Sequence, residues 1–243
     1  MGIFDNKVVL ITGGSSGIGA CAAKLFASHG AQVAFTYHNN SKGAEETEQA
    51  IVSVGGEALA IKADITSDTD VPHIIDKTIE RFGRIDVLVN NAGGYIAGDE
   101  WDGTVDIWRK SLDQNLVSMM NISKYVVEIF QKQGTGVMVN IASRHALGGE
   151  YDALSYGAAK AGVINITQAY AKLLAPYGRA NVISPSATEA GYWLTAPKEE
   201  LEEMLANRPN HKLVDPMTIA EKIVFLASDD ASDITGQNFP ITE

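Results

Sequence analysis

Short apolar segments alternate along the chain with longer segments whose apolar residues recur at helical spacing. Short apolar, β-branched segments are typical of strands in a parallel sheet, and helical spacing indicates amphipathic helices between them. The predicted strands are Lys7–Thr12, Gln32–Tyr37, Ala58–Lys62, Val87–Asn90, Val137–Ile141, Ala180–Ser184 and Gln237–Ile241. The predicted helices lie near Gly17–Ser28, Lys42–Val54, Asp68–Arg81, Thr104–Gln131, Ser155–Ala175 and Thr218–Ala227. Because this alternation forms right-handed βαβ units, we expect an α/β fold with helices on both faces of one parallel sheet.

One segment, from Ala187 to Asp215, departs from this alternation. It has no strand pattern, but it contains Tyr192, Trp193 and a short predicted helix over Lys198–Ala206. Long irregular segments of compact domains are often lids or binding loops, so a substrate lid and an ordinary surface excursion both stay open. Neither an internal repeat nor a low-complexity linker divides the chain, and we expect residues 1–243 to form a single domain.

Composition narrows the classes of protein to consider. The chain has 243 residues with 19 Lys and Arg against 30 Asp and Glu, which gives a formal net charge of −11. This surplus of carboxylates argues against binding to nucleic acid, which needs clustered Lys and Arg. No apolar stretch is long enough for a membrane span, the first residues do not resemble a signal peptide, and the lone Cys21 suits a reducing compartment. We therefore expect a cytoplasmic protein without a nucleic-acid or membrane partner.

A glycine-rich turn follows the first predicted strand directly and leads into a helix. Glycine allows positive φ and lets backbone N–H groups approach a phosphate closely, while a helix N-terminus supplies partial positive charge. A tight turn without a ligand is the alternative. In this position the turn favours a dinucleotide site. The residues expected to hold the pyrophosphate are Gly13, Ser15, Ser16, Gly17 and Ile18.

Several separated motifs occur in a fixed order along the chain. They are Thr12-Gly13-x-x-x-Gly17-x-Gly19, Asn90-Asn91-Ala92-Gly93, and Ser143 followed by Tyr156-x-x-x-Lys160. Together they resemble the short-chain dehydrogenase/reductase family over nearly the whole chain. The resemblance implies a doubly wound Rossmann fold, a three-layer sandwich with a seven-stranded parallel sheet in the order 3-2-1-4-5-6-7. It also implies a homo-oligomer, either a dimer or a tetramer.

The end of the second predicted strand bears on the choice of cofactor. In dinucleotide folds an acidic residue here binds the ribose hydroxyls and rejects a 2′-phosphate. This chain has no carboxylate from Thr36 through Lys42. Asn39, Asn40 and Ser41 can donate hydrogen bonds to phosphate oxygens and Lys42 can add positive charge, while a helix-capping loop is the alternative. Tyr37 and His38 are further candidates for cofactor contacts. We therefore expect NADP(H) in preference to NAD(H), although no arginine completes a phosphate clamp. The resemblance adds Asp64 and Ile65 near the adenine, Asn91, Ala92 and Gly93 near a ribose, and Pro185 and Thr188 near the carboxamide.

Tyr156 and Lys160 are four residues apart on a predicted helix and can face one site. A free tyrosine has a pKa near 10, and a nearby ammonium should lower that pKa, so the pair can exchange protons near neutral pH. Taken alone, such a pair is common on exposed helices. The resemblance implies that Tyr156 protonates a carbonyl or deprotonates an alcohol and that Ser143 orients the same oxygen. It further implies that Lys160 binds the nicotinamide ribose and that Asn115 positions a water.

The chain departs from the family pattern after the sixth predicted strand, where Ser186 replaces a glycine and Ala190 a threonine. Aromatic residues near the motifs are candidates for a substrate pocket or for ordinary packing. They are Tyr95, His145, Tyr151, Tyr192 and Trp193. No His, Asp and Glu cluster has metal-ligand spacing, and we expect no metal.

These observations predict an enzyme that transfers a hydride between NADP(H) and a carbonyl or secondary alcohol of a small molecule. An acyl-thioester ketoreductase is an alternative that needs basic residues near the site, for which Arg109, Lys110 and Arg144 are candidates. An NAD-dependent alcohol dehydrogenase and a nucleotide-binding protein without catalysis are further alternatives. The intact Ser143, Tyr156 and Lys160 argue against the last of these.

Overall fold

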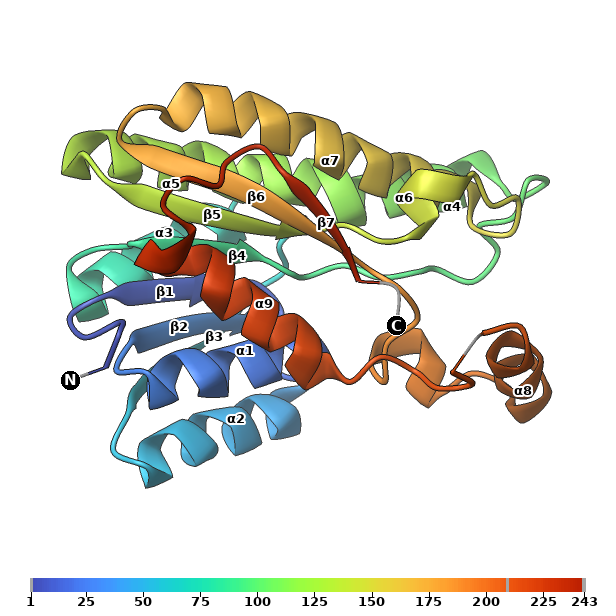
Figure 1. The fold of residues 1–243 in the computed structure, drawn as a ribbon, viewed down its shortest axis with the longest axis horizontal. Coiled ribbons are helices and arrows are strands. Elements are labelled where there is room, and N and C mark those ends of the chain that lie inside the picture. The colour runs from blue at the N-terminus through green and yellow to red at the C-terminus, as the bar shows by residue number, and fades with distance from the viewer. Residues whose placement is uncertain (1, 209, 242–243) are drawn as a thin grey trace.

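Seven parallel strands form one sheet in the order β3-β2-β1-β4-β5-β6-β7 (Figure 1). The structure is a computed structural model that describes residues 2–208 and 210–241, so the ends of the predicted domain at 1 and 242–243 lie outside the described residues. The strands are β1 Val8–Ile11, β2 Gln32–Tyr37, β3 Glu57–Lys62, β4 Val87–Asn90, β5 Gly136–Ile141, β6 Gly178–Pro185 and β7 Asn238–Ile241. The predicted strand order and parallel pairing are confirmed, and strand ends differ from the prediction by at most two residues.

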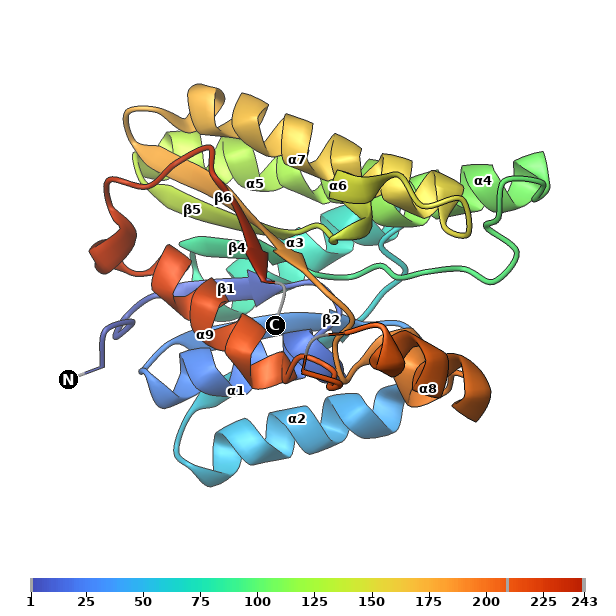
Figure 2. The same ribbon diagram turned by 45° about the vertical axis from the view of Figure 1, so that its right-hand side comes forward.

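Helices cover both faces of the sheet, which gives the expected three layers (Figures 1 and 2). The helices are α1 Gly17–Ser28, α2 Ser41–Ser53, α3 Asp70–Phe82, α4 Val105–Leu112, α5 Ser118–Gln133, α6 His145–Gly148, α7 Leu154–Leu174, α8 Lys198–Ala206 and α9 Pro216–Ala227. One face carries α1, α2 and α9, and the other carries α3, α5 and α7.

Two helical segments differ from the prediction. The continuous helix expected over Thr104–Gln131 is divided into α4 and α5 by a π-helical turn, Asp113–Val117. Such a turn widens the helix locally and recurs at functional sites, and its position depends on tertiary contacts that helical spacing does not reveal. The short α6 was not predicted, because four residues are too few for a periodic pattern.

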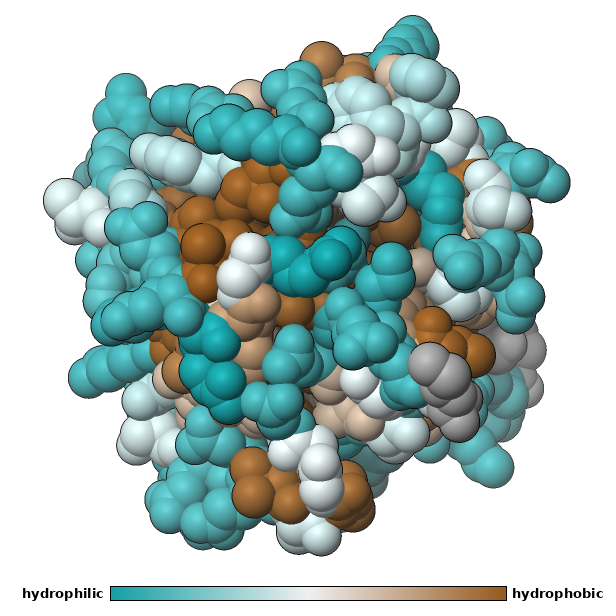
Figure 3. Space-filling model, turned by 90° about the vertical axis from the view of Figure 1, so that its left-hand side faces the viewer, coloured by the Kyte–Doolittle hydropathy of each residue, from teal (hydrophilic) through white to brown (hydrophobic). Residues whose placement is uncertain are grey.

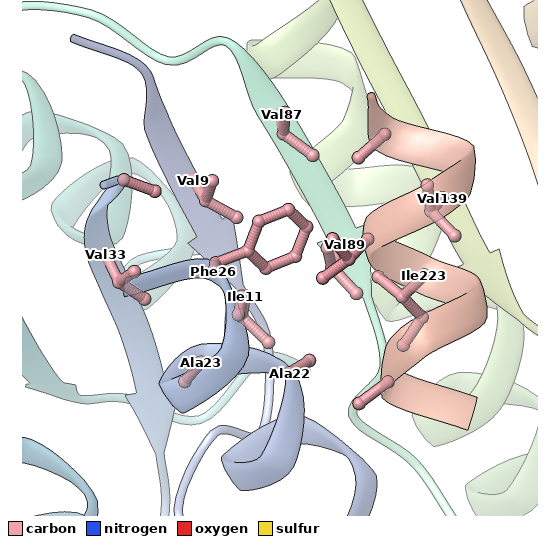
Figure 4. Close-up of a cluster of buried hydrophobic side chains, with 14 of the residues drawn as sticks. Val9, Ile11, Ala22, Ala23, Phe26, Val33, Val87, Val89, Val139 and Ile223 are labelled. Carbon is pink, nitrogen blue, oxygen red and sulfur yellow. The ribbon is translucent and has the colours of Figure 1, made fainter. Parts of the chain in front are cut away.

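The core lies between the sheet and each helical layer. All four residues of β1 are fully buried, which explains the uninterrupted apolar pattern of this central strand. Phe26 of α1 lies over Val9 and Val89 of neighbouring strands, with Ile223 of α9 beside it (Figure 4). This packing fixes α1, and with it the turn that connects β1 to α1.

The two ends of the segment from 187 to 215 pair with each other. Thr188 and Val214 form an isolated parallel bridge that the sequence did not predict, and between them lie a 3₁₀ turn, Gly191–Leu194, and α8. The predicted bounds of α8 are confirmed. The opposite end of the molecule, away from α8, presents a mainly hydrophilic surface (Figure 3). None of the helices in the described residues is long and apolar enough to cross a membrane.

Candidate active site

The glycine-rich turn between β1 and α1 brings the chain into very close contact with its neighbours. Gly13 and Gly17 have φ of +72° and +52°, which favours glycine. A Cβ at Gly14 would lie 2.5 Å from Cβ of Phe35, and one at Gly19 would lie 2.1 Å from the carbonyl oxygen of Gly13. Ser16 at the N-cap of α1 makes no side-chain hydrogen bond to the helix. The turn therefore presents backbone N–H groups at a helix N-terminus, as a bound phosphate requires.

Two threonines that sequence reasoning did not assign hold this turn in place. The Thr36 hydroxyl accepts a hydrogen bond from Gly13 N–H at 3.1 Å. The Thr12 hydroxyl accepts from Asn91 N–H and Ala92 N–H, both at 3.0 Å, and Asn91 Nδ2 donates to the carbonyls of Thr12 and Gly13. The first, second and fourth strands thus end in one hydrogen-bonded unit. A strand-end threonine followed by glycine is the signal that could have identified Thr12.

The polar residues after β2 have different surroundings. Asn40 caps α2 by accepting from Gly43 N–H at 3.0 Å, and its Nδ2 donates to the Ser15 carbonyl at 3.1 Å. The helix-capping interpretation therefore holds for Asn40. The His38 side chain is exposed, and its Nε2 lies 4.0 Å from a carboxylate oxygen of Asp64. Lys42 is exposed and pairs with Glu46 on α2 at 3.7 Å.

Asp64 follows β3 and closes a tight turn. Its Oδ1 accepts from the N–H of Thr66 at 2.9 Å and from the hydroxyl of Thr66 at 2.7 Å. These hydrogen bonds hold the pKa of Asp64 below its usual value. Asp64 does not cap the next helix, because α3 begins at Asp70. The neighbouring Ile65 packs partly buried against the core.

Asn115 and Lys160 meet at the glycines that follow β4. Asn115 lies in the π-helical turn, where its Oδ1 accepts from Gly94 N–H at 2.8 Å and its Nδ2 donates to the Gly94 carbonyl at 3.0 Å. Gly93 has φ of +139°, and a Cβ there would lie 2.5 Å from Oδ1 of Asn115 and 3.5 Å from Nζ of Lys160. Only glycine permits this approach. Lys160 Nζ also donates to the Ile141 carbonyl at 2.9 Å.

Tyr156 and Lys160 lie in the same helix, α7, with Nζ of Lys160 5.7 Å from the centroid of the Tyr156 ring. Burial raises the pKa of Tyr156, and the hydroxyl of Ser143 partly opposes this. This rise in the pKa of Tyr156 is the opposite of the lowering that was expected from the Lys160 ammonium. Burial also lowers the pKa of Lys160 to about 8, so this ammonium loses its proton more easily than an exposed lysine does. For Tyr156, burial therefore outweighs the hydrogen bond from Ser143 in setting the pKa.

Ser143 follows β5 and lies next to His145 of α6. The Ser143 hydroxyl accepts from His145 N–H at 3.2 Å and lies 3.2 Å from Nδ1 of the His145 ring. Burial lowers the pKa of His145, which favours the neutral ring. A neutral imidazole can either accept from or donate to the serine hydroxyl, so it can orient that hydroxyl.

Edge-to-face ring contacts connect Tyr156 to other aromatic residues from separate segments. His145 lies 5.7 Å and Tyr95 6.5 Å from Tyr156 between ring centroids. Tyr192 lies 5.2 Å from Tyr95 and 5.4 Å from Trp193. We call these five residues the aromatic cluster. Tyr151, the remaining substrate candidate, is 74% exposed, and the ring contacts found among the described residues leave it outside the cluster.

Carboxylates surround the aromatic cluster. The Tyr95 hydroxyl donates to Glu100 at 3.4 Å, and the Tyr192 hydroxyl donates to Glu200 at 2.6 Å. Burial and Glu100 raise the pKa of Tyr95 to about 12, and Glu200 raises the pKa of Tyr192 to about 12. Two further carboxylates, Glu150 and Asp152, act on His145, where Arg144 is the opposing cation.

The segment that follows β6 lies against the glycine-rich turn. Pro185 ends β6, and the Thr188 hydroxyl donates to the Ser186 carbonyl at 2.8 Å. Nη1 of Arg208 donates to the Ser186 hydroxyl at 2.9 Å, so the serine that replaces the usual glycine has a partner in the segment from 187 to 215. A Cβ at Gly17 would lie 2.8 Å from Cβ of Ala190.

The chain is similar to known oxidoreductases over nearly its full length. A family model described as enoyl-(acyl carrier protein) reductase matches residues 13–242. An uncharacterized oxidoreductase of Thermotoga maritima is 38% identical over 240 residues, covering 96% of this chain and 94% of the relative. A 3-oxoacyl-[acyl-carrier-protein] reductase of Synechocystis sp. is 36% identical over 240 residues, covering 97% and 95%.

The structure of NAD⁺-bound xylitol dehydrogenase matches with a TM-score of 0.90 and 31% identity, covering 98% of each chain. The fold, the order of the motifs and these full-length matches agree with one another. The chain belongs to the short-chain dehydrogenase/reductase family, whose members are nicotinamide-dependent oxidoreductases acting on alcohols and carbonyl compounds.

Proposed function

We propose that this protein interconverts a neutral small-molecule carbonyl compound and its secondary alcohol with NADP(H), and that Tyr156 is the general acid and base. The observation that carries the proposal is that Ser143, Tyr156, Lys160 and Asn115 meet at the carboxyl end of the sheet. Ser143 follows β5, Tyr156 and Lys160 lie on α7, and Asn115 lies in the π-helical turn. In doubly wound folds this end is where ligands bind.

The residues present fit a dinucleotide. Gly14 and Gly19 leave no space for side chains, and the N-terminus of α1 has no side-chain cap, so Gly13, Ser15, Ser16, Gly17 and Ile18 would hold the pyrophosphate. Asp64 and Ile65 would hold the adenine, Asn91, Ala92 and Gly93 a ribose, and Pro185 and Thr188 the carboxamide. The nicotinamide supplies or accepts the hydride when bound.

The protein's own residues would manage the proton and the substrate oxygen. During reduction, the Tyr156 hydroxyl donates its proton to the carbonyl oxygen, and during oxidation the phenolate removes the proton of the alcohol. Ser143 donates a hydrogen bond to the same oxygen, oriented by His145. Lys160 binds a ribose hydroxyl and favours the phenolate once a ligand covers the site, and Asn115 holds a water beside Lys160.

The test is Tyr156→Phe. Removing the hydroxyl leaves the ring and its packing, so we expect NADPH to bind with nearly the parental Kd, measured by cofactor fluorescence, while kcat falls by roughly a thousandfold or more. The proposal is wrong if the variant keeps more than about a tenth of the parental kcat under the same conditions.

The preference for NADP(H) rests on the segment after β2. His38, Asn39, Ser41 and Lys42 offer hydrogen-bond donors and positive charge, and none of them is acidic. The only carboxylate near His38 among the contacts described is Asp64, 4.0 Å from its ring. The xylitol dehydrogenase that matches this chain was solved with NAD⁺, so relatedness does not decide between the cofactors.

Asn39→Asp tests this preference by adding the missing carboxylate. A carboxylate here repels a 2′-phosphate, so we expect kcat/KM for NADPH to fall by about tenfold or more and kcat/KM for NADH to change little or rise. Asn39→Ser is the matched control, since it shortens the side chain without charge. Equal kcat/KM for NADPH and NADH in the parent enzyme would contradict the preference.

The acidic surroundings of the aromatic cluster favour an uncharged substrate over an acyl-carrier thioester. Five carboxylates act on residues of the cluster, namely Asp99, Glu100, Glu150, Asp152 and Glu200. Of the basic candidates, Arg109 is 74% exposed on α4 and lies 4.0 Å from Asp106. A phosphopantetheine carrier or its acidic protein would meet repulsion here. The homo-oligomer and the cytoplasmic location remain predictions.

A further inference from the structure

Asp99 is a fully buried acidic residue in the loop between β4 and α4, and none of the roles proposed above uses it. Gly98, at φ of +89°, precedes it, and a Cβ at Gly98 would lie 2.8 Å from Cδ1 of Ile107. The glycine thus lets the loop turn its aspartate inward. A buried carboxylate is costly unless hydrogen bonds compensate it, so its partners indicate its role.

Three consecutive N–H groups of the first turn of α7 donate to Asp99. Leu154 N–H donates to the Asp99 carbonyl at 2.8 Å, Ser155 N–H to Oδ1 at 3.0 Å and Tyr156 N–H to Oδ2 at 2.7 Å. The Ser155 hydroxyl also donates to Oδ1. Ala153 at the N-cap of α7 has no capping side chain. Asp99 therefore caps α7 from a segment more than fifty residues away in the sequence.

The same carboxylate also reaches the segment that holds Asn115. The Ser111 hydroxyl lies within hydrogen-bond distance of Oδ2 of Asp99, at 3.5 Å. The Ser111 carbonyl in turn accepts from Nδ2 of Asn115 at 3.0 Å. One buried carboxylate thus joins the first turn of α7, which carries Tyr156, to the last turn of α4, which leads into Asn115.

We infer that Asp99 is the positioning residue for Tyr156: by capping α7 it fixes the backbone of Tyr156 relative to Ser143 and Asn115. The inference rests on the catalytic role proposed above for Tyr156. The hydrogen bond from Tyr156 N–H makes the coupling direct, because a displacement of the first turn moves the phenol itself. Misplacement of a reacting group by about 1 Å can cost about a hundredfold in rate.

Asp99 also adds a negative charge at the N-terminal end of α7. The other titratable groups that face Tyr156 are Lys160 on α7, His145 on α6 and Tyr95 in the loop after β4. A nearby negative charge disfavours the phenolate. Removing that charge should therefore move the acidic limb of the pH profile for alcohol oxidation to lower pH, a change that loss of stability alone does not produce.

The experiment compares Asp99→Asn with Asp102→Asn, which removes an exposed carboxylate from the same loop. Rates are expressed per NADPH-binding site, measured by fluorescence titration, so that unfolded protein does not count. For Asp99→Asn we expect kcat to fall by roughly thirtyfold to a hundredfold, NADPH Kd to stay within about twofold, and the acidic limb to shift downward. Asp102→Asn should keep the parental kcat and pH profile.

A kcat per site within about twofold of the parent for Asp99→Asn, with an unchanged pH profile, would overturn the inference even if the variant melts at a lower temperature. Should Asp99→Asn fail to fold, Ser155→Ala decides, since it removes one hydrogen bond to Asp99 and leaves every backbone group in place. A severalfold loss of kcat supports the inference, and parental kcat refutes it. Tyr156→Phe is measured in parallel, and an active variant would show that the proposed function itself has failed.

Discussion

At the scale of single residues, the buried ammonium of Lys160 destabilises the folded protein, although the proposed chemistry requires it. It is 4% exposed, and burial lowers its pKa from 10.5 to about 8. Between these two values the unfolded chain binds a proton that the folded chain has released, so stability rises with pH across this range. Below about pH 8 the folded protein bears the full cost of a buried ammonium, on the order of 3 kcal/mol before relaxation.

Lys160→Met should therefore raise the free energy of unfolding at pH 7 by about 1–3 kcal/mol while turnover is lost. The gain is reduced by the Ile141 carbonyl, which loses its donor. Urea unfolding at pH 7 and at pH 9 measures the effect, and the gain should shrink at the higher pH. Lys172→Met, at an exposed position of the same helix, should change stability by less than about 0.5 kcal/mol. A Lys160→Met protein less stable than the parent at pH 7 would contradict the argument.

The sequence identifies some functional residues better than others, and the difference is physical. Tyr156 and Lys160 are found because helical spacing puts them on one side of α7 and because Ser143 and the glycine-rich turn precede them in the order typical of the family. Asp99 is missed because its partners are backbone N–H groups fifty-five or more residues ahead, which no local pattern reveals. The expected lowering of the Tyr156 pKa is wrong for the same reason, since burial, which raises this pKa, depends on the whole fold.

At the scale of elements, α9 is held to the sheet by a buried cation. Arg179 of β6 is 8% exposed and donates to the carbonyls of Leu226 and Ser228 at the end of α9. A cation satisfies the terminal carbonyls of a helix and complements its dipole. Arg179 lies at the start of β6, whereas Pro185, at the proposed cofactor site, ends the same strand. Its loss should therefore affect stability much more than catalysis.

We expect Arg179→Met to lower the free energy of unfolding by about 2–4 kcal/mol, because two carbonyls lose charged donors. The kcat of the folded fraction should stay within about twofold of the parent. Arg179→Lys keeps the charge but cannot donate to both carbonyls with one planar group. Its free energy of unfolding should therefore lie between those of the parent and Arg179→Met. Chemical denaturation and activity at low temperature test both points. Equal stability of parent and Arg179→Met would show that the helix end needs no cation.

The bounds of helices and strands were predicted correctly where the residues of the segment itself determine them. The bounds of α8 follow from Pro197 before it and from its helix-forming residues, and β2 follows from an apolar β-branched segment. The break between α4 and α5 was not predictable, because the chain there remains locally helical. The widened turn coincides with the contact between Asn115 and Gly94, a contact that only the assembled sheet provides.

At the scale of the whole molecule, charge is distributed unevenly between the proposed cofactor site and the aromatic cluster at the proposed substrate site. The net charge is −11, yet the proposed pyrophosphate site uses backbone N–H groups and a helix N-terminus rather than arginines. Around the aromatic cluster, Arg144 opposes the carboxylates that act on His145, and Lys160 lies beside Tyr156. On the proposed function, we expect this arrangement to accept a polyanionic cofactor and a neutral substrate and to repel a polyanionic substrate.

This distribution predicts how substrate charge and salt act together. With NADPH saturating, acetoacetyl-CoA should have a lower kcat/KM than the uncharged acetoacetyl-N-acetylcysteamine thioester. Raising the salt concentration from about 20 mM to about 300 mM shortens the screening length and should reduce that difference severalfold. A neutral cyclic ketone should respond little.

The double variant Glu150→Gln/Asp152→Asn should reproduce the effect of salt at low ionic strength, because it removes two of the repelling charges. If acetoacetyl-CoA is instead the better substrate at low salt, basic residues such as Arg144 dominate the approach, and the acyl-thioester ketoreductase becomes the better assignment.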